Sequence, residues 1–199
     1  MDQLLNTCRP HIVEDFDGNL EFPCAVEPKY DGHRVIVTIC PKSGHAVATT
    51  RRGRDVTSHM SQQIKTLKYA IAEYGMSDVA AFDGELCHSR GPRDVTSICC
   101  SRYHSRDIHL RYVVFDMPIP LNTEIYTSRR TAMRAVLRGF ESRQLSIIES
   151  TIANSLDCVR GLYRHSISAG HEGIVVKQLS SCYGDSRSWV RVKPSLCSW

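Results

Sequence analysis

Short apolar runs alternate with polar positions along much of the chain, and this pattern predicts strands. Residues 33–40 alternate and are rich in β-branched side chains, so they predict a strand. The segment Ala46–Thr50 returns as a second strand after Pro41-Lys42-Ser43-Gly44, a turn-rich hairpin connection. Four more segments of similar character predict strands: Val79–Leu86, Arg111–Met117, Gly173–Gln178 and Trp189–Lys193.

Three other segments place apolar residues at helical spacing and predict helices. The first has Met60, Ile64, Leu67, Ile71 and Tyr74 and ends at Gly75; the second covers 128–140, with Met133, Val136, Leu137 and Phe140 on one face; the third has Ile152, Leu156, Val159, Leu162 and Tyr163 and ends near Gly170. Strand runs interrupted by helices, with hairpins present, indicate an α+β domain with mainly antiparallel sheets flanked by helices.

Length and composition set the class of protein. At 199 residues and 42% hydrophobic content, the chain is predicted to fold as one domain over residues 1–199 and to be a monomer. No apolar stretch reaches about 18 residues, so we expect no membrane span. The first six residues carry an early acid and no long apolar run, so we expect no secretory signal and an intracellular protein of the cytoplasm or nucleus, or a viral protein acting in its host cell.

Charge and cysteine usage refine this expectation. The net charge is +4, with six lysines against nineteen arginines. Arginine suits phosphate because its planar fork donates two parallel hydrogen bonds, which favours nucleic acid, although codon bias explains the skew equally well. The nine cysteines include no Cys-x-x-Cys pair, so they indicate reduced, mostly buried thiols rather than a zinc site or a disulfide framework.

Five short motifs follow one another in a definite order. They are Lys29-Tyr30-Asp31-Gly32-His33-Arg34, Phe82-Asp83-Gly84-Glu85-Leu86, Tyr112-Val113-Val114-Phe115-Asp116, Glu172-Gly173-Ile174-Val175-Val176-Lys177 and Trp189-Val190-Arg191-Val192-Lys193. Together they supply a nucleophilic amine, carboxylates for a metal, an aromatic ring for a base and cations for phosphates. That set of groups is suited to moving a nucleotidyl group.

The first motif provides the candidate nucleophile, Lys29. A lysine attacks phosphorus only as the neutral amine, which burial and nearby positive charge favour. Gly32 allows the backbone to approach a ligand closely, and Arg34 is placed to reach a ribose or phosphate. For this hexapeptide taken alone, an exposed turn between strands is the simpler interpretation.

Carboxylates, a ring and further cations stand at the ends of the other predicted strands. Asp83 and Glu85 alternate on a strand and point the same way, and Glu172 precedes another strand, so the two glutamates suit a magnesium ion shared with phosphates. Phe115 offers a face to a purine or is a core residue. The cations Lys177, Arg191 and Lys193 either converge on one phosphate group or are solvated strand ends.

With all five motifs in order, the chain resembles the covalent nucleotidyltransferases and, within them, the ATP-dependent DNA ligases. The segment from Phe22 to Arg34 resembles the ligase nucleophile region, Thr50-Arg51-Arg52-Gly53 the Ser-Arg-x-Gly element, and Tyr183–Lys193 the approach to the last strand. The resemblance runs from about Cys8 to Lys193 and implies a nucleotidyltransferase (ATP-grasp-like) adenylation fold.

The resemblance also implies a role for each site residue, with ATP and Mg²⁺ or Mn²⁺ as cofactors. Lys29 would be adenylylated by ATP, AMP would pass to a 5′-phosphate at a nick, and a 3′-hydroxyl would displace it. The implied ligands are Glu27 at the adenine edge, Phe115 and Val175 around the ring, Arg34 and Glu85 at the ribose, Glu85 and Glu172 at the metal, Arg51 at a phosphate of nucleotide or DNA, and Lys177, Arg191 and Lys193 at the nucleotide phosphates.

Two features depart from the family pattern. Arg191 stands where these ligases usually carry lysine, and only six residues follow Lys193, too few for the OB-fold domain that normally comes next. We therefore expect an isolated adenylation domain without an OB-fold, which acts on nicked duplex DNA with an OB-fold domain or partner in trans. The alternatives are an RNA ligase, a GTP-dependent capping guanylyltransferase, or a non-catalytic binding remnant.

Overall fold

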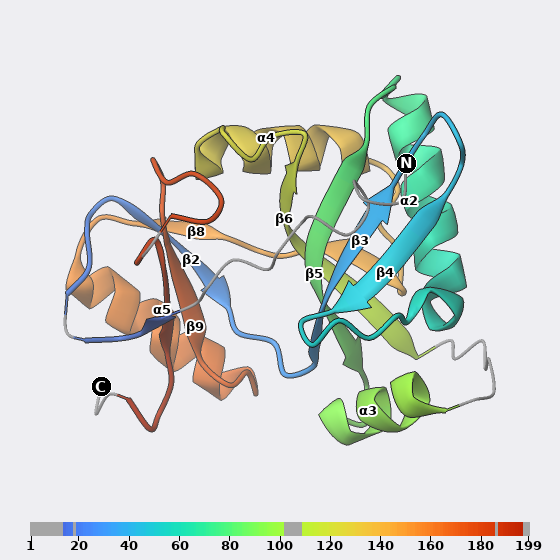
Figure 1. Cartoon of the computed structure of the whole chain (residues 1–199). Coiled ribbons are helices and arrows are strands. Elements are labelled where there is room, and N and C mark those ends of the chain that lie inside the picture. The colour runs from blue at the N-terminus through green and yellow to red at the C-terminus, as the bar shows by residue number, and fades with distance from the viewer. Residues whose placement is uncertain (1–13, 18, 102–108, 186, 197–199) are drawn as a thin grey trace. The chain divides into compact units, whose positions relative to one another are not determined.

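The computed structural model describes residues 14–17, 19–101, 109–185 and 187–196, and these form two compact units (Figure 1). The first unit contains Gly32–Asn122 and Arg129–Ile147. The second contains the described residues before Gly32, the short segment Thr123–Ser128, and the chain from Ile148 onward. Each unit has its own five-stranded sheet and its own hydrophobic core.

The sheet of the first unit has the strand order β4-β3-β5-β6-β7. Its strands are β4 (Ala46–Thr50), β3 (His33–Ile39), β5 (Ala80–His88), β6 (Leu110–Ile119) and β7 (Leu145–Ile147). Four of them confirm predicted strands, and β3 and β4 form the expected hairpin. All the pairs in this sheet are antiparallel except β6 with β7.

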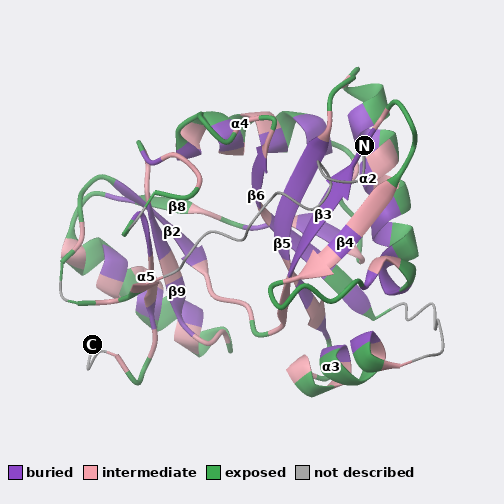
Figure 2. Ribbon diagram, in the orientation of Figure 1, coloured by how far each residue is buried: buried purple, intermediate pink, exposed green. Residues whose placement is uncertain are grey.

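One face of this sheet is apolar and packs on helices. The helical elements are η1 (Thr57–Met60), α2 (Ser61–Glu73), α3 (Pro92–Cys100) and α4 (Tyr126–Leu137). The first three residues of α4, 126–128, belong to the second unit. The core combines strand residues such as Val37 and Phe82 with Leu67 of α2 and Met133 of α4, all fully buried. Figure 2 shows the central strands of the sheet as largely buried.

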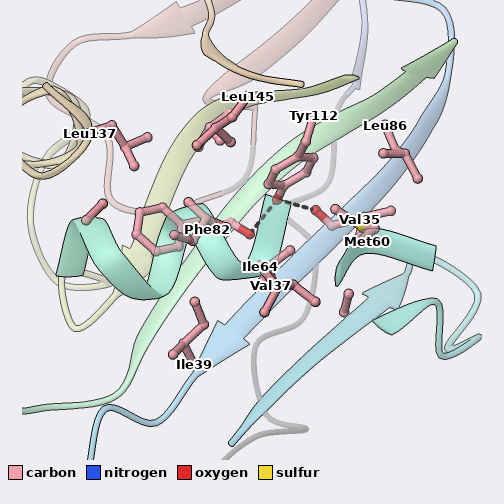
Figure 3. Packing of buried hydrophobic residues seen from close by; sticks show 14 of the residues in the cluster. Val35, Val37, Ile39, Met60, Ile64, Phe82, Leu86, Tyr112, Leu137 and Leu145 are labelled. Carbon is pink, nitrogen blue, oxygen red and sulfur yellow. Dashed lines mark hydrogen bonds between the residues drawn. The ribbon is translucent and has the colours of Figure 1, made fainter. Parts of the chain in front are cut away.

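Tyr112 crosses the core face of the central strands (Figure 3). Its hydroxyl lies 2.9 Å from the backbone carbonyl oxygens of both Val35 and Phe82. The ring passes over Gly84, where an added Cβ would lie 2.6 Å from a ring carbon and from the Val113 carbonyl oxygen. Glycine is required at position 84 because the ring occupies the space of any side chain.

A fully buried ion pair joins β6 to α4. Arg129 donates from Nε to Asp116 Oδ1 at 2.8 Å and from Nη2 to Oδ2 at 2.9 Å, and the two side chains are 0% and 1% exposed. The backbone amide of Met117 also donates to Asp116 Oδ1. This bidentate geometry compensates the cost of burying both charges.

The sheet of the second unit has the order β1-β10-β9-β2-β8. Its strands are β1 (Glu14–Asp15), β10 (Trp189–Val192), β9 (Ile174–Gln178), β2 (Cys24–Pro28) and β8 (Thr151–Ala153). Every pair is antiparallel except β1 with β10. The helix α5 (Leu156–Ser168) lies along this sheet (Figure 1), and Val159 and Tyr163 join Val26, Val176 and Val192 in its core.

Both long helices end where the sequence predicts. Gly75 has φ of 78° and donates to the Ala72 carbonyl, while Met76 donates to the Ile71 carbonyl. Gly170 repeats this arrangement at the end of α5, with φ of 85°. These are the paired hydrogen bonds of a glycine-terminated helix, so the predicted stop signals are confirmed.

Other predicted boundaries are wrong. Ile152 lies on β8 and is 49% exposed, not on a helix face, because the Ser155 side chain caps α5 and starts it at Leu156. The helix predicted over 128–140 runs from Tyr126 to Leu137, so Phe140 lies beyond its end. Five elements were not predicted, because their apolar runs are short or irregular: β1, β2, β7, β8 and α3.

The α+β class and the mainly antiparallel sheets are confirmed. Within the described part of the chain, no helix combines the length and the apolar character needed to cross a membrane.

The described cysteines are free thiols: Cys24, Cys40, Cys87, Cys99, Cys100, Cys158 and Cys182. Three of them, Cys24, Cys40 and Cys99, are buried, and burial raises the pKa of the Cys24 and Cys99 thiols to about 11. The expectation that most thiols are buried is therefore wrong for the described set. The other two cysteines, Cys8 and Cys197, lie outside the described residues, and so does Ser186 of the Tyr183–Lys193 segment.

Candidate functional site

In the second unit, the sheet face opposite α5 carries the polar candidates. Side chains alternate along each strand, so Val26, Val176 and Val192 face the core while their neighbours face the other way. The register then aligns three residues in a row across neighbouring strands, with Val175 opposite both Glu27 and Arg191. The sheet thus gathers on one face groups that are far apart in the sequence.

Lys29 follows β2 and is fixed at the backbone. Its amide donates to the Gly173 carbonyl at 2.8 Å, and its carbonyl accepts from the Glu172 amide at 3.1 Å. The Lys29 ammonium forms a short ion pair with Glu172 Oε2, and Lys193 Nζ lies 3.7 Å from the same oxygen. These three side chains are 22–30% exposed, so a ligand in solution can reach them.

The two lysines control the protonation of Glu172. Partial burial raises the pKa of its carboxyl, but the hydrogen bond and charge of Lys29, with the charge of Lys193, outweigh burial and hold the pKa below the ordinary value. Glu172 is therefore an anion over the whole neutral range, as a cation ligand must be. Gly173 follows it with φ of 150°, and an added Cβ there would lie 2.0 Å from the Val192 carbonyl oxygen.

Lys177 and Arg191 are each paired with a different carboxylate. Lys177 Nζ lies 2.7 Å from Glu27 Oε2, and both side chains are 1% exposed, so the alternative of a solvated strand end is wrong for Lys177. Arg191 donates from Nε to Asp15 Oδ1, and this hydrogen bond raises the pKa of Arg191 and lowers that of Asp15. Since Lys193 contacts Glu172, the three cations share no carboxylate.

In the first unit, the sheet face opposite the core carries Arg34, Asp83 and Glu85. Arg34 lies opposite Glu85 in the register but forms its ion pair with Asp83, through Nε to Oδ1 at 3.0 Å and Nη2 to Oδ2 at 2.5 Å. Asp83 is fully buried and Glu85 is partly exposed. The backbone amide of Arg51, in the turn after β4, donates to the Arg34 carbonyl at 3.2 Å.

Phe115 stands at an irregularity in β6. Gly84 lies opposite Val114, but Asp83 lies opposite Asp116, so Phe115 is the extra residue of a bulge. A bulge of this kind changes the direction of a side chain, and here the Phe115 ring is partly exposed while its neighbours are buried. The Arg34 guanidinium lies 5.4 Å from the ring centroid. Phe115 is absent from the core cluster, which supports the purine-stacking prediction over the core alternative.

The substitution Phe115→Leu is expected to weaken nucleotide binding and to leave folding nearly unchanged. A base stacked on an aromatic ring gains about 1–3 kcal/mol, so ATP affinity should fall roughly tenfold or more. Leucine keeps most of the apolar volume, and the loss of stability should stay below about 1.5 kcal/mol. Isothermal titration and thermal melting of the same samples measure both effects. Unchanged ATP affinity with a much lower melting temperature would make Phe115 a structural residue only.

The structure brings together some predicted site residues and separates others by unit. The second unit contains Glu27, Lys29, Glu172, Val175, Lys177, Arg191 and Lys193. The first unit contains Arg34, Arg51, Glu85 and Phe115. Three partners of these residues were not predicted from the sequence: Asp15, Tyr126 and Trp189. Asp15 and Tyr126 lie outside the five motifs, and no local pattern marks them.

A metal ion would depend on few protein ligands. The described residues contain no group of three or more His, Cys, Asp and Glu side chains that could hold a metal ion. Glu172 is nevertheless ionised and partly exposed. Magnesium is commonly held by one or two carboxylates, with water and substrate phosphates completing its shell, so the donors present fit this ion.

The fold is that of ATP-dependent DNA ligases. The DNA ligase of bacteriophage T7 in complex with ATP matches with a TM-score of 0.74 and 15% identity, over 96% of this chain and 70% of that one. The Chlorella virus DNA ligase-adenylate matches with a TM-score of 0.73 and 18% identity, over 93% and 67%.

The sequence comparison identifies the family. The family model described as "ATP dependent DNA ligase domain" matches residues 3–193, so the chain belongs to this family. DNA ligase 2 of Methanosarcina mazei is 26% identical over 96% of the chain and 36% of its own length. The multifunctional non-homologous end joining protein LigD of Pseudomonas aeruginosa is 29% identical over 86% of the chain and 20% of its own length. The chain thus spans about a third or less of these relatives.

Proposed function

We propose that the chain is a DNA ligase adenylation domain that takes AMP from ATP onto Lys29 and transfers it to the 5′-phosphate at a nick in duplex DNA. The observation that supports it most is the Lys29–Glu172–Lys193 cluster on a chain of the ATP-dependent DNA ligase domain family. An amine, a carboxylate and a second cation meet at strand ends, where a rigid scaffold holds them.

In the first step, the Lys29 amine attacks the α-phosphorus of ATP. A phosphorus–nitrogen bond forms, the bond from the α-phosphorus to the bridging oxygen breaks, and pyrophosphate leaves with that electron pair. Lys29 must first give up one proton and part from Glu172, since an ammonium group has no lone pair, and its nitrogen loses a second proton as the phosphorus–nitrogen bond forms; both protons pass to the solvent. Lys193, 3.7 Å from Glu172, then supplies positive charge close to the reacting phosphates.

In the second step, an oxygen of the DNA 5′-phosphate attacks the same phosphorus. The phosphorus–nitrogen bond breaks, and its electron pair returns to Lys29, whose nitrogen takes up two protons from the solvent and becomes an ammonium group again. The 3′-hydroxyl then displaces AMP and closes the strand. Glu172 and Glu85 would hold a divalent cation, which neutralises charge on the phosphates when bound.

The purine site is assigned by the same proposal. Phe115 and Val175 take the two faces of adenine, Glu27 takes its edge, and Arg34 with Glu85 takes the ribose. Arg51, Arg191 and Lys193 take phosphates. The location is intracellular, since nicked DNA and ATP are found there.

Incubation with magnesium and α-labelled ATP tests the function. We expect a covalent label on the protein and a mass increase of one AMP on a peptide that contains Lys29. Parallel incubation with α-labelled GTP separates a ligase from a capping guanylyltransferase, and nicked DNA and nicked RNA added to the labelled protein compare the two acceptors. A chain that binds ATP without becoming labelled would be the non-catalytic alternative.

A further inference from the structure

Glu27 is a buried carboxylate with a protein partner on each oxygen. It lies on β2 opposite Val175 and is 1% exposed. Tyr126 Oη donates to its Oε1 at 2.6 Å, and Lys177 Nζ lies 2.7 Å from its Oε2. Both distances are those of strong, charge-assisted hydrogen bonds. The carboxylate is therefore held in one orientation.

Lys177 is as buried as Glu27, and aromatic rings surround its ammonium group. Nζ lies 3.9 Å from the centroid of the Trp189 ring and 5.2 Å from that of Tyr126. Trp189 is 1% exposed and occupies the β10 position opposite Lys177. Burial between rings stabilises the cation through their π-faces, but it also shields the cation from an anion in solution.

Tyr126 is fixed in place by its backbone. Its amide donates to the Ser181 carbonyl at 2.8 Å, and the next amide, of Thr127, donates to the Leu179 carbonyl at 3.3 Å. These bonds attach the first turn of α4 to the chain that leaves β9 just beyond Lys177. The tyrosine hydroxyl also lies 3.2 Å from Ser150 Oγ. The position of the phenol is thus set independently of any ligand.

An ionised carboxylate accepts hydrogen bonds and cannot donate them. It pairs with the exocyclic amino group of a 6-aminopurine and repels the carbonyl oxygen that a 6-oxopurine presents at the same place. A protonated or rotated carboxyl would lose this discrimination. The ammonium of Lys177 and the hydroxyl of Tyr126 each donate to one oxygen of the carboxylate, so together they hold it in a fixed orientation.

We propose that Lys177 and Tyr126 are positioning residues for Glu27, and that they set the preference of this site for a 6-aminopurine over a 6-oxopurine. Lys177 then acts on the base through Glu27 and makes no contact with phosphate, in contrast to the role implied by the family resemblance. This inference rests on the proposed function, which places the purine edge at Glu27.

The test measures binding to the two halves of ATP separately, with adenosine and inorganic tripolyphosphate as probes. In Lys177→Met, adenosine affinity should fall about tenfold or more, as for one lost charge-assisted hydrogen bond, while tripolyphosphate affinity stays within about twofold. If Lys177 contacts phosphate, the result reverses: tripolyphosphate binding is lost and adenosine binding is kept. That reversal would overturn the proposal.

Lys177→Met leaves the Glu27 charge buried without its cation, so this variant alone could fail to fold. A double-mutant cycle separates such misfolding from a loss of adenosine binding. The neutral combination Lys177→Met with Glu27→Gln should restore folding. In the Glu27→Gln background, Lys177→Met should change adenosine affinity by no more than about twofold, because Lys177 acts through the carboxylate. An undiminished effect in that background contradicts the proposal.

Tyr126→Phe removes one hydroxyl group and should reduce the ratio of adenosine to guanosine affinity several-fold. Tyr112→Phe is the matched control, since it also removes a buried hydroxyl but lies in the core of the first unit. It should lower the melting temperature and leave the purine ratio unchanged. Equal purine ratios in wild type and Tyr126→Phe would contradict the role of Tyr126.

The proposed function can fail separately. A wild-type chain that binds adenosine and tripolyphosphate but takes no label from ATP would refute lysine adenylylation, and the binding cycle would still decide the role of Lys177. A wild-type chain that binds tripolyphosphate and no adenosine would overturn the positioning role.

Discussion

Lys29→Ala is expected to abolish covalent labelling by α-labelled ATP. The amine is the atom that bonds to phosphorus, and alanine offers no nucleophile, so the label should fall below detection rather than decrease by a factor. Noncovalent ATP binding should persist, because Lys193 and the purine contacts remain. Gel autoradiography measures the label, and equilibrium binding measures the affinity.

The matched control is Lys42→Ala. The Lys42 side chain is 75% exposed and lies 4.0 Å from Asp78, a loose surface pair, so its loss should leave both labelling and stability unchanged. Equal labelling of Lys29→Ala and the wild type would transfer the nucleophile role to another residue. A melting temperature for Lys29→Ala close to that of the wild type would exclude unfolding as the cause of lost labelling.

The second large effect is expected on stability, for Arg129→Met. Methionine keeps the apolar bulk but leaves Asp116 buried with an uncompensated negative charge. Breaking a buried ion pair from one side costs about 3–5 kcal/mol, whereas an exposed pair contributes about 1 kcal/mol or less. Urea denaturation should show the midpoint falling accordingly, with little change in slope.

Two further variants sharpen this prediction. Adding Asp116→Asn to Arg129→Met removes the stranded charge and should recover part of the lost stability. Arg160→Met is the exposed control, because Arg160 and its partner Asp157 are 38% and 89% exposed. A loss in Arg129→Met no greater than in Arg160→Met would mean that the buried pair contributes little.

The strands and helices with strong periodicity were predictable, and the short ones were not. The segment Ala46–Thr50 is a strand with the predicted bounds, and Gly75 ends its helix as expected, because local patterns determine both. The strand β8 has three residues, and its Ile152 happens to stand four positions before Leu156, which imitates a helix face. Tertiary pairing with β2 decides this segment, and no local signal reports that pairing.

The site also divides into contacts that sequence motifs predicted and contacts that only the fold determines. The motif order predicted that Lys29 and Glu172 lie together, although 143 positions separate them. The pairing of Arg34 with Asp83 rather than Glu85 depends on side-chain reach across the strands, which alternation alone does not determine. The partners of Glu27 come from a helix start and a strand that only the fold brings together.

The extra residue in β6 lets this strand lose one position without changing its faces. Side chains in a strand point alternately to two faces, yet Val114 and Met117, three positions apart, both lie in the core. The extra residue supplies the odd step, so deleting it would give regular alternation and keep Met117 in the core. Descendants of this chain that lose the codon for Phe115 should therefore keep the fold of this strand and lose the partly exposed ring.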